Sequence, residues 1–126
     1  MKRLLLLTTI ATMLAACGHK IPEKYLESDK LPNIYPDYTN VTVPINMAPL
    51  TFQIDGKVDE VVARLTVGDQ EVICGGNKIQ PDADDWRQLA EAAKGKDIKV
   101  EVYVEEDGNW TRFKPFSIYV SPDSID

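Results

Sequence analysis

The sequence predicts a mainly β fold, an antiparallel β-sandwich with one short inserted helix. Short stretches in which apolar and polar residues alternate recur across residues 39–122, which is the period of half-buried strands. Turn-forming pairs separate several of these stretches, namely Asp55-Gly56, Gly68-Asp69 and Asp107-Gly108. One stretch, near residues 82–94, has the period of a helix instead. A small barrel is the alternative arrangement of the same strands.

The first strands are predicted between residues 41 and 76. Residues 41–43 are β-branched and precede Pro44, which suits an edge strand because proline has no N–H to donate. Leu50, Phe52 and Ile54 alternate with polar residues. Residues 61–67 and 71–74 flank Gly68-Asp69 and therefore predict a hairpin, which ends at the glycines of residues 75–76.

The helix is predicted to begin after Asp82, an N-cap residue, and to end before Gly95. Its apolar side chains form one stripe: Trp86, Leu89, Ala90 and Ala93. The carboxylates of Asp82, Asp84 and Asp85 could also ligate calcium, but the glycine and glutamate that an EF-hand loop requires are missing. We therefore interpret these acids as helix-capping residues.

The last third of the sequence predicts a second hairpin. Residues 98–104 alternate valine and isoleucine with polar residues up to the turn at Asp107-Gly108. The return strands carry Trp110, then Phe116, Ile118 and Val120. Six or seven short strands of this kind are typical of immunoglobulin-like or fibronectin type III-like sandwiches.

The N-terminal sequence has the order of an export signal. Lys2 and Arg3 precede an apolar stretch, residues 4–14, which is too short to span a bilayer comfortably. The run Leu14-Ala15-Ala16-Cys17 then resembles the lipobox of bacterial lipoproteins. This resemblance implies cleavage between Ala16 and Cys17 and lipidation of Cys17. The predicted organisation is a signal peptide (1–16), a lipidated tether (17–38), a sandwich domain (39–122) and a tail (123–126).

The lipobox resemblance also implies a location. Gly18 follows the cysteine, whereas lipoproteins kept in the inner membrane typically carry aspartate there. We therefore expect lipid anchoring in the outer membrane, on its periplasmic face, with the cell surface as the alternative. The net charge of −6 becomes more negative when Lys2 and Arg3 leave with the signal, and an acidic protein repels nucleic acid. Nucleic acid is therefore excluded as a partner.

The counts of cysteine and histidine argue against an enzyme. The chain has two cysteines and one histidine, His19, which falls in the predicted tether. No Ser-His or Cys-His dyad is expected inside the domain, and we predict no catalytic residue, metal site or cofactor. Cys74 is interpreted as a small buried residue. A reactive thiol at Cys74, in a hydrolase or thiol enzyme, is the alternative.

Aromatic residues of the last hairpin are the candidate interaction surface. Tyr103, on the polar side of its strand, is the best candidate, followed by Tyr119 and Trp110; core filling is favoured for Trp110 and Phe116. Such a surface would bind a protein partner in the envelope, or a glycan as the alternative. The run Asp123-Ser124-Ile125 resembles an O-glycosylation acceptor, which makes Ser124 a candidate glycosylation site.

Residues 35–52 and 108–120 resemble the N-terminal domain of TolB-like envelope lipoproteins of Gram-negative anaerobes. In that family the domain precedes a WD-repeat-like β-propeller, and a Cys-x-x-Cys-His element lies in the later region. Neither feature occurs in this sequence, so no functional residue is transferred. We therefore expect a non-catalytic interaction or spacer module on the residue counts above. The resemblance leaves two interpretations open, a stand-alone domain or the N-terminal part of a longer propeller protein.

Overall fold

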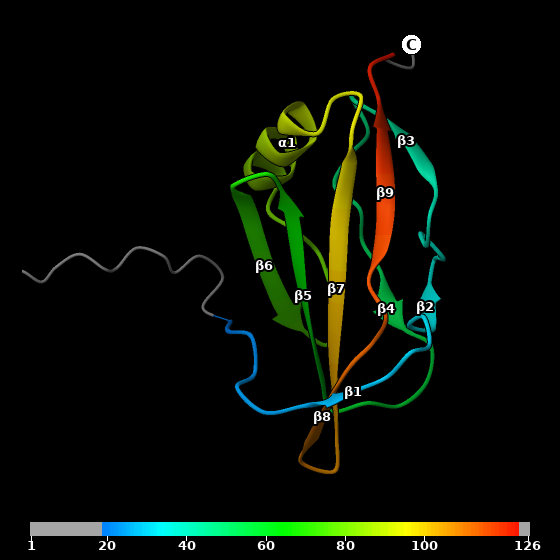
Figure 1. Cartoon of the computed structure of the whole chain (residues 1–126), viewed down its shortest axis with the longest axis vertical. Coiled ribbons are helices and arrows are strands. Elements are labelled where there is room, and N and C mark those ends of the chain that lie inside the picture. The colour runs from blue at the N-terminus through cyan, green and yellow to red at the C-terminus, as the bar shows by residue number, and fades with distance from the viewer. Residues whose placement is uncertain (1–18, 124–126) are drawn as a thin grey trace, which may run out of the picture.

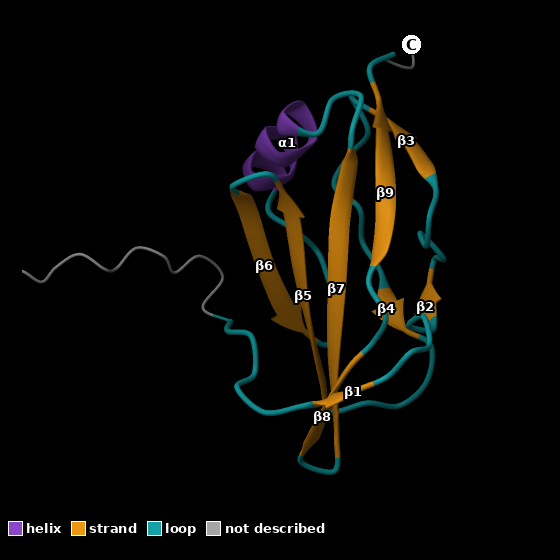
Figure 2. Cartoon of the chain, in the orientation of Figure 1, coloured by secondary structure: helices purple, strands orange, loops and turns teal. Residues whose placement is uncertain are grey.

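The computed structural model describes residues 19–123, which form a mainly β sandwich with one short helix (Figures 1 and 2). The sheets do not close into a barrel, so the barrel alternative is wrong. In chain order the elements are β1 (Leu26–Glu27), β2 (Ile34–Tyr35), β3 (Thr42–Pro44), β4 (Gln53–Ile54), β5 (Glu60–Val67), β6 (Gln70–Gly76), α1 (Ala83–Ala92), β7 (Asp97–Glu106), β8 (Asn109–Arg112) and β9 (Phe116–Ser121).

The larger sheet is organised around β7, its longest strand. One side of β7 pairs with β5, which in turn pairs with β6. The other side pairs with β9 along its first half and with β8 along its second half. These pairs are antiparallel as predicted, but β1 pairs with β8 and β3 pairs with β9 in parallel. β1 and β3 are far from β8 and β9 in the sequence. No tight turn joins these pairs, so the antiparallel direction that a hairpin imposes does not apply to them.

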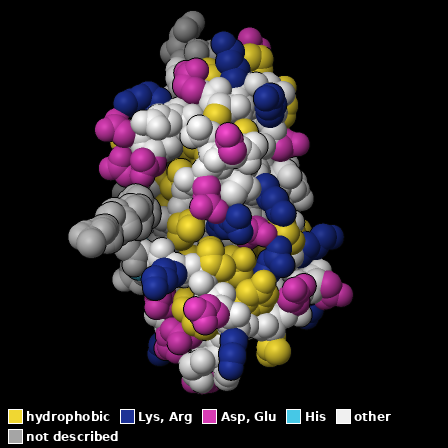
Figure 3. Space-filling view, turned by 60° about the vertical axis from the view of Figure 1, so that its left-hand side comes forward, with side chains coloured by type: hydrophobic (Ala, Val, Ile, Leu, Met, Phe, Trp, Pro, Cys, Tyr) yellow, Lys and Arg dark blue, Asp and Glu magenta, His cyan; other side chains and the backbone are white. Residues whose placement is uncertain are grey.

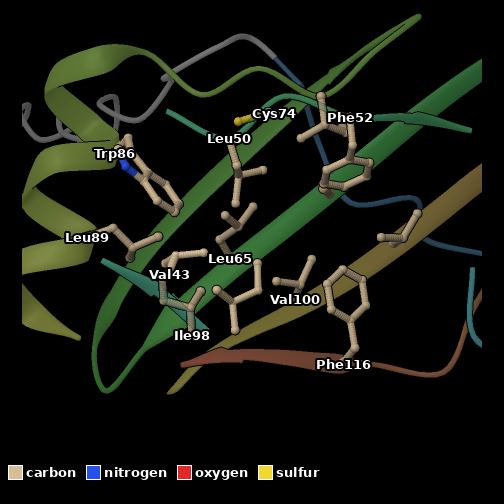
Figure 4. Close-up of a cluster of buried hydrophobic side chains, with 14 of the residues drawn as sticks. Val43, Leu50, Phe52, Leu65, Cys74, Trp86, Leu89, Ile98, Val100 and Phe116 are labelled. Carbon is tan, nitrogen blue, oxygen red and sulfur yellow. The ribbon is translucent and has the colours of Figure 1, made fainter. Parts of the chain in front are cut away.

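The second layer is smaller and consists of the β2–β4 pair, the segment before β4 and the helix. The predicted strand around Phe52 is shorter than expected, because Phe52 forms only an isolated bridge with Ile79 ahead of β4. Figure 4 shows part of the core between the layers, where these side chains meet: Val43, Leu50, Phe52, Leu65, Trp86, Leu89, Ile98, Val100 and Phe116.

Local sequence signals explain the ends of the helix and of the last hairpin. Asp82 caps the helix as predicted, since its Oδ2 accepts the backbone N–H groups of Asp84 at 3.0 Å and Asp85 at 3.4 Å. Asp107 and Gly108 both have positive φ, 52° and 82°, as a two-residue turn between twisted strands requires. The predicted apolar stripe of the helix is buried in the core.

The segment predicted as a tether is partly built into the domain. Of the predicted range 17–38, residues 17 and 18 lie outside the described residues, but β1 and β2 belong to the sheets. Ile34 is buried, and Tyr38 packs against the core. The tether prediction is therefore wrong for these parts, because their backbone and apolar groups find partners on the sheets.

Candidate functional site

The three predicted interaction residues lie on one face of the large sheet, the face opposite the core. Because side chains alternate along β7, its odd-numbered residues point to this outer face while Ile98 and Val100 point to the core. Tyr103 belongs to this set, Trp110 pairs with Glu105, and Tyr119 pairs with Asp97. The other predicted site residues, Ala16, Cys17 and Ser124, lie outside the described residues.

These aromatic residues do not form one exposed patch. Tyr103 is only 2% exposed, so the prediction that it lies at the surface is wrong. Tyr119 is 38% exposed, but its partner Asp97 is six residues along β7 from Tyr103, or about 20 Å. Trp110 is half-buried and lies outside the core cluster, so core filling is confirmed for Phe116 and wrong for Trp110.

An N-terminal segment covers Tyr103. The ring of Tyr25 packs edge-on against the ring of Tyr103, with ring centroids 5.3 Å apart and an interplanar angle of 75°. Trp110 lines an open groove together with Pro22 and Leu26 of the same segment. The aromatic side chains that a protein partner or a glycan would contact are therefore partly covered by the chain's own N-terminal segment.

A network of ion pairs lies beside Tyr103 on the outer face, centred on Glu101. This carboxylate belongs to a residue only 5% exposed. Its Oε2 accepts a hydrogen bond of 2.6 Å from Arg112 Nη2 and lies 3.7 Å from Lys99 Nζ, while Oε1 lies 3.6 Å from Arg64 Nη1. The hydrogen bond to Glu101 raises the pKa of Arg112. Three cations therefore compensate one buried carboxylate.

The network extends outward to exposed carboxylates. Arg64 Nε lies 2.6 Å from Glu71 Oε2, although its N–H is not aligned on any acceptor among the described residues. Arg112 Nη1 lies 3.7 Å from Glu27 Oε2. Figure 3, turned to bring the left-hand side of Figure 1 forward, shows basic and acidic side chains interspersed around apolar ones. Such alternation balances charge locally instead of creating a patch of one sign.

Burial of Tyr103 makes the domain less stable at alkaline pH. Desolvation, followed by the charge of Glu101, raises the pKa of Tyr103 above its ordinary value of 10.0. The folded state thus keeps the phenol proton at a pH where the unfolded chain loses it. The stability from this residue is complete below pH 10.0 and decreases as the pH rises further. We expect Tyr103→Phe to lose less stability than wild type between neutral and strongly alkaline pH.

Urea unfolding at several pH values, followed by far-UV circular dichroism, checks this expectation. The difference between variant and wild type is the relevant quantity, because it cancels the effects of alkaline pH on the rest of the chain. Tyr35→Phe is the matched control, because Tyr35 is 67% exposed. Parallel pH curves for wild type and Tyr103→Phe would contradict the assignment.

The thiol of Cys74, the remaining candidate reactive group, is buried in the domain. Cys74 is 2% exposed, as its interpretation as a small buried residue predicted, whereas a thiol enzyme needs an accessible thiolate.

Within residues 19–123, no three His, Cys, Asp or Glu side chains are grouped so that they could hold a metal ion. No helix in that same part of the chain is long and apolar enough to cross a bilayer.

Comparison of the chain with protein-family models, with curated proteins and with solved structures gave no match.

Proposed function

We propose that the protein is an envelope lipoprotein, anchored through Cys17, whose domain is a non-catalytic interaction or spacer module. The observation that carries the proposal is the N-terminal order of basic residues, short apolar stretch, small residues and cysteine. Two or three acyl chains on Cys17 would anchor the domain firmly, because each buried CH₂ contributes about 0.8 kcal/mol. The buried state of Cys74 further supports a non-catalytic role.

The location proposed is the outer membrane, facing the periplasm, as Gly18 implies by resemblance. Within residues 19–123, the large apolar side chains that are exposed supply the surface for an envelope protein partner. They are Leu26, Leu31, Tyr35 and Tyr119. Because they are scattered over different elements, the contact with such a partner would be small, as in transient complexes.

Expression of the full chain in a Gram-negative host tests the anchor. We expect mass spectrometry to find an N-terminal peptide that begins at Cys17 and carries diacylglyceryl and acyl groups, and fractionation to place the protein in the membrane. Cys17→Ser should abolish both the modification and the membrane association. Cys74→Ser is the matched control and should leave both intact, since Cys74 is buried in the domain. A chain that retains Met1 in the cytosol would contradict the proposal.

A further inference from the structure

We propose that residues 19–30, here called the strap, hold the lipid anchor at the Gly75 corner of the large sheet and keep the domain directly against the bilayer surface. The proposal rests on the proposed lipidation of Cys17. The strap runs from the end of β6 to β8, next to which it forms β1 (Figure 1), and its Tyr25 packs on Tyr103 on the way. The partner that this arrangement fits is the headgroup layer of the membrane.

The strap begins in contact with Gly75 of β6. A Cβ atom on Gly75 would lie 2.7 Å from Nδ1 and 2.8 Å from Cγ of His19, so the imidazole occupies the space of the missing side chain. The same Nδ1 lies 3.6 Å from Glu60 Oε2 on β5. These contacts place the first residue of the strap on the β5–β6 hairpin.

The strap continues over Tyr103 and ends on β8. Tyr25 packs on Tyr103, and Leu26–Glu27 then pairs in parallel with residues 111–112 of β8. The N–H of Ser28 donates to the carbonyl of Arg112 at 2.9 Å, and the N–H of Lys114 donates to the carbonyl of Lys30 at 2.8 Å. Contacts at both ends and in the middle therefore fix the strap to the sheet.

A fixed strap places the anchor much closer to the domain than a flexible linker would. Cys17 is two residues before His19, and two residues span at most about 7 Å. A free linker over residues 18–38 would instead have a root-mean-square length of about 25 Å. With acyl chains on Cys17, the Gly75 corner is thus held at the headgroup layer, whereas a free linker would let the domain move away from it.

Two labelled variants of the lipidated protein test this orientation. Asn77→Cys places a fluorophore near the Gly75 corner, and Asp69→Cys places one at the other end of β6; both positions are exposed. The probe is a phosphatidylcholine vesicle that carries a quencher on its headgroups. About 20 Å separates the two ends of β6, so we expect at least about twofold stronger quenching at Asn77 than at Asp69.

Releasing the strap should remove this difference. Gly75→Ala combined with Tyr25→Ala removes its first and middle contacts, and the φ of Gly75 permits alanine. Tyr35→Ala is the matched control, because that ring is exposed. We expect similar quenching at both positions in the release variant, and unequal quenching as in wild type in the control.

Trypsin cleavage after Lys20 and Lys24 provides a measurement of docking that is independent of the vesicles. We expect slow cleavage in the folded wild type and an increase of about tenfold or more in the release variant, because local opening limits cleavage. Equal quenching at Asn77 and Asp69 in a chain with acylated Cys17 would overturn the inference and leave the proposed function standing. An unmodified Cys17 would instead refute both.

Discussion

Trp86→Ala is expected to lower the free energy of unfolding by about 3–5 kcal/mol, the usual range for removing a large buried aromatic ring. Trp86 is 2% exposed and points from the helix into the core toward Leu50 and Leu89 (Figure 4). Its Nε1–H also donates a hydrogen bond of 3.0 Å to the carbonyl of Met47. The alanine variant therefore creates a cavity and leaves that carbonyl without this donor.

Thermal and urea unfolding, followed by far-UV circular dichroism, measure this effect. In a domain of this size each kcal/mol lowers Tm by about 4–8 °C, so we expect a loss of roughly 12 °C or more. Trp86→Phe keeps most of the ring and should cost less than Trp86→Ala. Trp110→Ala is the control for removal of an indole, since Trp110 is half-buried on the outer face. If Trp110→Ala cost as much as Trp86→Ala, the core would be wrongly located.

The sequence predicts Trp86 correctly because helix period and burial coincide there. Trp86, Leu89 and Ala93 lie on one stripe, and the only face that a short helix can bury is its apolar one. The same holds for the core side of β7, where Ile98, Val100, Val102 and Val104 all belong to the core cluster. Local patterns are sufficient at these positions because one side of each element faces the core and the other does not.

The outer face shows where local pattern is insufficient. Alternation along β7 assigns Tyr103 and Glu101 to the side away from the core, which is correct, but does not reveal that another segment covers that side. The strap that covers Tyr103 has strand contacts only two residues long, too short to produce a period. Pro22 and the charged residues of the strap are typical of a linker, whereas its pairing with β8 is decided by tertiary contacts.

The ion pairs of Glu101 also require knowledge of the register. Arg64 and Glu101 are opposite each other on β5 and β7, although they are far apart in the sequence. Arg112 reaches Glu101 from β8, where it is paired with Tyr103, two residues along β7 from Glu101. From the sequence alone, a glutamate on the polar side of a strand is expected to be exposed to solvent. Its burial can be inferred only when the positions of the neighbouring strands are known.

Glu101→Gln is expected to lower the free energy of unfolding by about 2 kcal/mol, less than the 3–5 kcal/mol measured where a buried ion pair loses one partner. The substitution removes the charge that three cations surround. The Arg112 and Arg64 side chains are 24% and 39% exposed, so water compensates part of the loss. Urea unfolding at neutral pH measures the change, and Glu101→Ala should cost more because it also removes the hydrogen-bond acceptor of Arg112.

Glu71→Gln is the matched control, because Glu71 contacts the same Arg64 but is 43% exposed. Exposed ion pairs contribute about 0–1 kcal/mol and are screened by salt, so its effect should be small and should disappear in 1 M salt, where the Debye length is about 3 Å. The effect of Glu101→Gln should persist in the same salt, since the carboxylate is shielded from ions by the sheet and its cations. Equal costs for the two substitutions, or equal sensitivity to salt, would mean that Glu101 is solvated in the folded protein. The charges of the outer face would then stabilise the domain no more than ordinary surface charges do.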